Sequence, residues 1–275
     1  MAFVGILRVL IAVARKDLAL IRRYPLNLAA RIVEPIGWLV PVYFLGRTFA
    51  RDGQVPGFAA WTGTTDFMAF IVAGWVLSGY VSAVTWGMGF ALKNEMDSGV
   101  LESNWISPQP PVLLLAGRTI ASVLATTVTS LGFGALAVLV FDISLRAQVL
   151  PALAIVAPVV IGLYGFGFIV AGAVLRMRDA NTLIDTGNFI LGILSGRDYP
   201  VRVLPRPLLL ISLLLPLTYG YDALRAVIVG TRTLLPLPVE IGVMIVFMVV
   251  MVVLGTKTFA RLERRCRLEG TLSQH

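Results

Sequence analysis

Apolar residues run along this chain in long stretches that contain no acidic or basic side chain. Residues 67–92 and 119–141 are the clearest cases. Uncharged runs of about 20 residues are typical of helices that cross a membrane. The pattern predicts an all-α integral membrane fold, a single transmembrane domain over residues 1–275 with six transmembrane helices. We expect these spans near residues 32–49, 66–92, 111–141, 150–175, 182–194 and 237–255.

The first 30 residues show a helical period in place of a continuous apolar run. One face is apolar and carries Leu7, Leu10, Ile11, Ala14, Leu18 and Ile21. Another is basic, with Arg8, Arg15 and Arg22. This predicts an N-terminal amphipathic helix that lies in the membrane interface within residues 1–30, after which Pro25 turns the chain toward the bilayer. The alternative is an ordinary surface helix of a soluble domain.

Two later segments depart from simple spans. The fifth, residues 182–194, would be about 20 Å long at about 1.5 Å per residue, less than the bilayer core of about 30 Å. Residues 195–232 are apolar but interrupted by Pro216, Gly220 and Asp222. Because lipid cannot satisfy the backbone groups that such breaks release, we expect an external re-entrant pair of short helices there, buried against protein before the last span.

Residues 93–110 form a polar stretch between the second and third spans. Its acids Glu95, Asp97 and Glu102 follow a short helical pattern that Pro108 closes. A short acidic helix displayed between two spans predicts contact with a soluble partner that supplies the chemistry. A plain solvated loop is the alternative.

Composition agrees with a membrane protein. The chain is 57% hydrophobic with a mean hydropathy of +0.86, and 14% of its residues are charged, against roughly 25% in soluble domains. The net charge of +8 indicates basic loops on the cytoplasmic side, not nucleic-acid binding. With both termini in the cytoplasm, most lysines and arginines lie inside. We therefore expect a multi-pass protein of the cell membrane, in contact with lipid.

The sequence offers no catalytic or metal-binding set. Cys266 is the only cysteine and His275, the last residue, the only histidine. This excludes an internal disulfide and disfavours a metal site or a Cys-His or Ser-His arrangement. The chain also has no G-x-x-x-x-G-K-[ST] motif for a nucleotide. We expect a chain that is not an enzyme and binds no cofactor.

Two motifs carry a resemblance to a known family. The acidic loop reads Glu95, Gly99, Val100, Leu101, Glu102, Ser107 and Pro108. The late block reads Ser195-Gly196, Tyr199-Pro200, Leu204-Pro205, Pro216-Leu217-Thr218-Tyr219 and Arg225. With the basic helix before the first span, they make the chain resemble an ABC-2-type exporter permease, the membrane subunit of an ABC transporter. One departure is Arg197-Asp198, where an apolar residue is more usual.

The resemblance implies a permease that does not itself hydrolyse ATP. Two copies of a cytoplasmic ABC ATPase would bind ATP and Mg, and a second permease, the same chain or a paralogue, would complete the transporter. The cytoplasmic coupling loop 93–110 would contact the ATPase through Glu95, Asp97, Gly99, Leu101 and Glu102. The cargo would be a lipid, a glycan or a hydrophobic small molecule.

Further candidate residues lie inside the membrane region. A substrate path between the second and fifth spans would use Phe67, Phe70, Trp75, Asn188 and Phe189, although such residues more often pack or face lipid. An external gate would use Tyr219, Tyr221, Asp222 and Arg225, and the last two are spaced to pair on a helix. Asp185 is a functional candidate or a partner of a nearby arginine.

Two other classes of function compete. A secondary transporter or channel without an ATPase partner would show internal repeats, and none is evident. An intramembrane enzyme would need paired carboxylates. Tyr221-Asp222 superficially resembles an aspartyl membrane protease motif, but the second motif is missing.

Because Cys266 is the only thiol and follows the last span, it reports the orientation of the chain. A membrane-impermeant maleimide should label it in inverted vesicles and leave it unlabelled in intact cells. A Cys266→Ser variant controls for background. Labelling of intact cells would contradict the arrangement with both termini inside.

Overall fold

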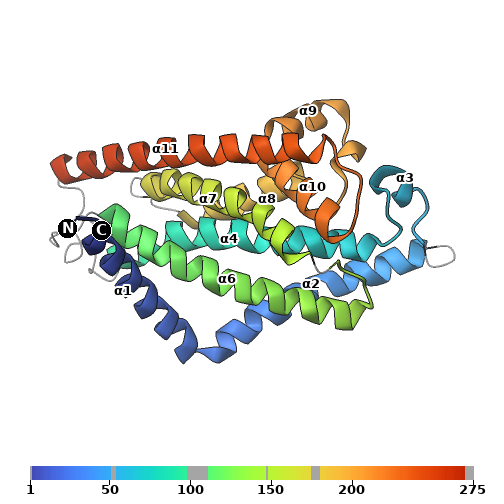
Figure 1. Cartoon of the computed structure of the whole chain (residues 1–275), viewed down its shortest axis with the longest axis horizontal. Coiled ribbons are helices and arrows are strands. Elements are labelled where there is room, and N and C mark those ends of the chain that lie inside the picture. Colours follow the sequence, from blue (N-terminus) through green and yellow to red (C-terminus); the bar gives the residue numbers. More distant parts are fainter. Residues whose placement is uncertain (1, 51–53, 98–110, 147, 175–179, 270–275) are drawn as a thin grey trace.

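The computed structural model describes residues 2–50, 54–97, 111–146, 148–174 and 180–269, and its regular structure is helical (Figure 1). In these ranges five helices are long and apolar enough to cross a membrane. They are α2 (Pro25–Phe49), α4 (Phe67–Asp97), α6 (Pro111–Phe141), α7 (Val149–Val174) and α11 (Leu237–Glu269). The all-α integral membrane fold predicted from hydropathy is confirmed.

The short apolar helix α8 (Ala180–Leu194) lies beside α4 and is shorter than the five candidate spans. It runs antiparallel to α4, because Asn188 bonds Thr85 while Arg197, just beyond α8, lies over the ring of Trp75. The start of α1 (Ala2–Arg23) and the end of α11 lie at one end of the bundle, which we call the termini end (Figure 1). The opposite end of the bundle is called the distal end.

The predicted pair of short helices is present at the distal end. Helices α9 (Arg206–Leu214) and α10 (Pro216–Ile228) meet at 87°. Side chains satisfy the carbonyls that the break releases, since Thr218 donates to the Ser212 carbonyl at 2.6 Å and Tyr219 to the Leu213 carbonyl at 2.8 Å. The chain therefore caps the break with its own hydroxyl groups, as a break inside a membrane requires.

Some boundaries differ from those expected. The predicted loop 50–65 contains a short helix, α3 (Phe58–Thr62), flanked by Gly57 and Gly63 in the left-handed region at φ 77° and 78°. Helix α4 continues five residues past the expected end, and α11 continues through the basic tail to Glu269. Both extensions are rich in good helix formers and contain no proline, so nothing stops the helix where its apolar run ends.

The amphipathic helix α1 is separate from the first span. It ends at Arg23, and Pro25 begins α2. It packs along α6, where the side chain of Val13 lies so close to Gly117 that a Cβ atom at Gly117 would clash with it. The neighbouring Ala14 is buried. Its basic residues Arg15 and Lys16 are exposed. Leu7 and Ile11 of the predicted apolar face are exposed as well, and α1 runs obliquely to the other long helices (Figure 1).

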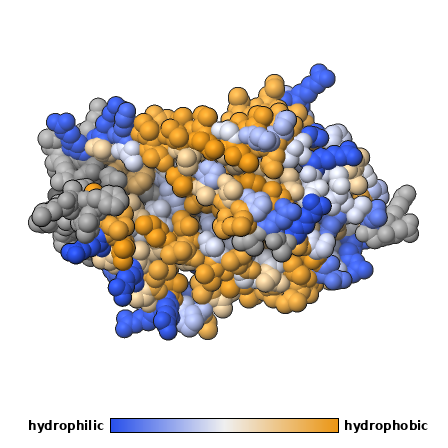
Figure 2. Space-filling view, in the orientation of Figure 1, coloured by the Kyte–Doolittle hydropathy of each residue, from blue (hydrophilic) through white to orange (hydrophobic). Residues whose placement is uncertain are grey.

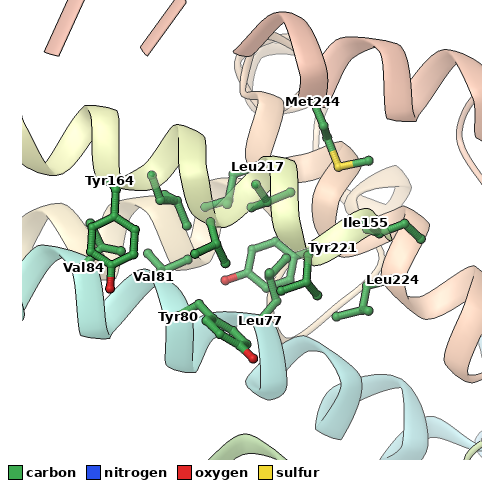
Figure 3. Close-up of a cluster of buried hydrophobic side chains, with 14 of the residues drawn as sticks. Leu77, Tyr80, Val81, Val84, Ile155, Tyr164, Leu217, Tyr221, Leu224 and Met244 are labelled. Carbon is green, nitrogen blue, oxygen red and sulfur yellow. The ribbon is translucent and has the colours of Figure 1, made fainter. Parts of the chain in front are cut away.

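The main core joins α4, α7, α10 and α11. Figure 3 shows Leu77, Tyr221 and Met244 converging from three of these helices, with Ile155 of α7 beside them. The outer surface is apolar over the middle of the molecule and hydrophilic at its two ends (Figure 2). Large apolar side chains such as Leu139 and Leu150 are exposed, and such a surface is suited to lipid contact.

Glycines let α7 and α11 approach closely, as the glycine-rich pattern of α7 predicts. A Cβ at Gly162 would lie 2.6 Å from the ring of Phe247. One at Gly165 would overlap the backbone of Met251 and Val252, and one at Gly255 would overlap the carbonyl of Gly165. The two backbones are therefore in direct contact.

Replacing Gly165 with alanine should force α7 and α11 apart, because backbone atoms cannot move aside as a flexible side chain does. Overpacking of this kind costs about 1–3 kcal/mol. The melting temperature of the detergent-solubilised protein should fall. Gly134→Ala in α6 is the matched control, since nothing lies within 4 Å of its added Cβ. Equal melting temperatures for the two variants would contradict the direct contact.

Candidate functional site

The distal half buries a basic side chain, Arg225 of α10, which is 3% exposed. Its Nε donates to the Phe70 carbonyl of α4 at 2.9 Å, and its Nη1 to the Gly196 carbonyl at 2.8 Å. Its Nη2 donates to the Arg197 carbonyl. The guanidinium thus ties α10 to α4 and to the turn after α8. We call this set of contacts the arginine clamp.

Aromatic rings and a glycine complete the clamp. The Arg225 guanidinium carbon lies 3.7 Å from the centroid of the Phe70 ring and 5.8 Å from that of Tyr221. Gly74 leaves the space, because a Cβ there would overlap the Arg197 carbonyl and the Arg225 guanidinium. Burying a charge is costly unless it is well hydrogen-bonded. Three carbonyl dipoles and a π face take the place of water here.

A second network lies beside the clamp and uses the Arg197-Asp198 pair that departs from the family pattern. The two side chains form an ion pair at 2.9 Å. The indole Nε1 of Trp75 donates to Asp198 at 2.9 Å, and Arg197 lies 5.1 Å from the Trp75 ring centroid. The pair therefore binds the turn to α4, at the position where an apolar residue is more usual in the family.

The expected pairing of Asp222 with Arg225 is wrong. Asp222 instead accepts from the backbone N–H of Leu234 at 2.5 Å, and Glu240 of α11 accepts from Leu235 at 3.0 Å. The reason is geometric, since the guanidinium points toward three carbonyls on one side of α10. The two carboxylates hold the 229–236 connection against the helix pair.

The two tyrosines assigned to the external gate have different surroundings. Tyr221 is 1% exposed and belongs to the main core, so its ring packs and does not line an open path. Tyr219 is half-buried and binds across the bend. In the turn before η1 (Val201–Val203), Tyr199 donates to the Ile193 carbonyl. Burial, and then the nearby Asp198 carboxylate, raise the pKa of Tyr199, which keeps this donor protonated.

The residues assigned to a substrate path lie along α4 and α8, as expected, but they are not equivalent. Phe70 and Trp75 belong to the clamp and its neighbouring network. Phe67 is half-buried and packs on Gly46 of α2. Asn188 accepts from Thr85 at 3.0 Å, while its buried amide nitrogen has no partner. Phe189 is 64% exposed. Only Asn188 and Phe189 have groups left for a ligand.

The expected coupling residues lie at the termini end of α4. Glu95 and Asp97 are in its last turns, as part of the span helix and not of a separate short helix. Gly99, Leu101 and Glu102 lie outside the described residues. Asp185 is exposed on α8 and makes no ion pair with any described residue, and Arg178, the nearby arginine considered as its partner, lies outside the described residues.

Two site residues escaped the sequence reasoning. Asp198 was noted only as a departure from the family pattern, and Glu240 was not singled out, although it is fully buried in the first turn of α11. A carboxylate at the start of a long apolar run is the signal that would have found Glu240. In the described ranges no three His, Cys, Asp or Glu side chains are placed to hold a metal ion.

The five long apolar helices and the bent helix pair define a polytopic membrane protein. The family model of the ABC-2 type transporter matches residues 8–229. The chain therefore belongs to the ABC-2 type transporter family and is the transport subunit itself, without catalytic machinery. Comparison with curated proteins gave no match.

Replacing Arg225 with methionine should destabilise the fold, since three carbonyls lose their donor. Each buried unsatisfied group costs about 1–3 kcal/mol. Arg225→Lys keeps the charge but not the planar fork, so it should rescue only part of the loss. The melting temperature in detergent measures both. The control is Arg206→Met, which changes an exposed arginine on α9. If Arg225→Met lowers the melting temperature no more than this control does, the clamp contributes little to stability.

Proposed function

We propose that this chain is the permease subunit of an ATP-driven exporter that moves a lipid, a glycan or a hydrophobic small molecule out across the cell membrane. Two copies of a separate ATPase would bind ATP and Mg, and a second permease, the same chain or a paralogue, would complete the assembly. Membership of the ABC-2 type transporter family supports the proposal. In this assembly both termini face the cytoplasm and the distal end faces outward.

The observation that carries the proposal is the continuity of α4. Its uncharged run ends at Leu92, but the helix runs on to Asp97. At about 1.5 Å per residue, residues 93–97 extend the helix roughly 7 Å beyond that run. One end of α4 thus carries Glu95 and Asp97 into the polar region, and the other carries Phe70 in the arginine clamp.

This continuity suggests how ATP hydrolysis would reach the cargo path. The acids at the termini end, with Gly99, Leu101 and Glu102 beyond, would orient the ATPase against the permease. A displacement there would pass along α4 as along a rod, because a helix is stiff along its axis. At the distal end the Phe70 carbonyl would pass it to Arg225 and so to the pair α9–α10, the external gate.

The seam between α4 and α8 is the proposed cargo path. Asn188 keeps an unpaired amide nitrogen toward this seam, and Phe189 is exposed next to it. An apolar, partly polar lining of this kind fits amphiphilic or hydrophobic cargo. The second permease would close the open side of the seam.

Reversing the charge of Glu95 and Glu102 in one variant, E95K/E102K, should weaken binding of the ATPase subunit or uncouple its hydrolysis. A buried charged contact is worth about 2–5 kcal/mol when one partner is removed. The tagged permease is purified from its host membranes, and the co-purified ATPase and the ATP hydrolysis of the complex are measured.

The matched control is E263K/E269K, which makes the same change of net charge on the tail of α11. Both variants must reach the membrane at wild-type levels. If E95K/E102K retains wild-type assembly and hydrolysis, the acids are solvated and do not couple. If the wild-type permease itself binds no ATPase, the result supports the alternative of a secondary transporter or channel.

A further inference from the structure

A cavity of about 380 Å³ lies closer to the termini end than the clamp does. It is walled by α1, the start of α2, and the termini-side halves of α4, α6 and α7. Its volume is within the range of about 300–1,000 Å³ that is typical of ligand pockets. Among the residues assigned to coupling, path or gate, none lines it.

The polar part of the cavity is rich in positive charge. Lys16 of α1, Arg31 of α2 and Arg118 of α6 contribute three cations, and Asp17 contributes the one carboxylate. In the described chain neither Lys16 nor Arg31 forms an ion pair, with Asp17 or with any other acid. Two cations therefore remain without a counterion. The hydroxyls of Ser122 and Tyr164 complete the polar wall.

Most of the remaining lining is apolar. The cavity lies near the end of the uncharged run of α6, because Arg118 directly precedes that run, residues 119–141. This is the depth of lipid headgroups. Leu20, also in the lining, is 55% exposed, so apolar lining continues onto the outer surface. A ligand with an anionic head and an apolar tail fits this gradient.

The cavity walls are held by close helix contacts. Val13 of α1 sits on Gly117 of α6, where an added Cβ would lie 2.8 Å away. Ile32 of α2 sits on Gly132 of α6 at the same distance. The cavity is therefore preformed, with a low cost of ordering when a ligand binds.

We propose that this cavity binds the phosphate headgroup of an anionic phospholipid from the leaflet at the termini end. Lys16 and Arg31 contact the phosphate, and the acyl chains leave past Leu20 along the outer surface. Asp17 limits the affinity, because its carboxylate faces the same space. The site does not depend on the ATPase or on the identity of the cargo.

The test measures the melting temperature of the purified chain in detergent with increasing phosphatidylglycerol, phosphatidylcholine or glycerol 3-phosphate. Phosphatidylglycerol should raise the melting temperature, and the other two should not. K16Q/R31Q should weaken the apparent affinity for phosphatidylglycerol roughly tenfold to thirtyfold, whereas Asp17→Asn should strengthen it. The control R8Q/R206Q removes two exposed arginines outside the cavity and should bind like the wild type.

Each other result overturns the proposal. An equal shift with phosphatidylcholine would indicate unspecific contact with lipid chains, and a shift with glycerol 3-phosphate would indicate a site for soluble anions. If K16Q/R31Q binds phosphatidylglycerol as tightly as the wild type, the cavity is not the binding site. The melting temperature of K16Q/R31Q without lipid must match that of R8Q/R206Q, which separates loss of the site from loss of the fold.

Discussion

The distal half of this molecule depends on one buried cation whose partners are backbone carbonyls. Arg225 reaches the Phe70 carbonyl on α4 and the Gly196 and Arg197 carbonyls after α8. Carbonyls, unlike carboxylates, cannot lose their function by protonation or by side-chain rotation. The clamp therefore fixes the relative positions of α4, α8 and α10 while the α9–α10 bend itself is held by local hydroxyl bonds.

The polar contacts around the clamp are arranged in layers. Trp75, Arg197 and Asp198 bind the turn to α4, and Asp222 and Glu240 bind the connection to α11. Each group makes its bond to a backbone or to a neighbour that is itself fixed. Such a cap moves as a unit, so a force applied through α4 displaces the whole cap and not one loop. This property suits the proposed external gate.

The two ends of the bundle use charge differently. At the distal end Arg225 is buried and hydrogen-bonded, although other arginines there, such as Arg206, are exposed. At the termini end Arg15 and Lys16 are exposed on α1, and Arg31 lines the cavity. Buried charge gives a defined geometry, and displayed charge leaves groups available for partners and lipid. Proposed coupling and lipid binding are accordingly both at the termini end.

The sequence alone determined the class of protein, the spans and the separate helix α1, because hydrophobic length and period are local properties. It also determined that residues 195–232 break, since proline and glycine act where they stand. Tertiary structure decided the partners of Arg225. The sequence spacing favoured Asp222, three residues away, but the Phe70 carbonyl is 155 residues away. Only the packing of α4 against α10 brings such groups together, and no local pattern records it.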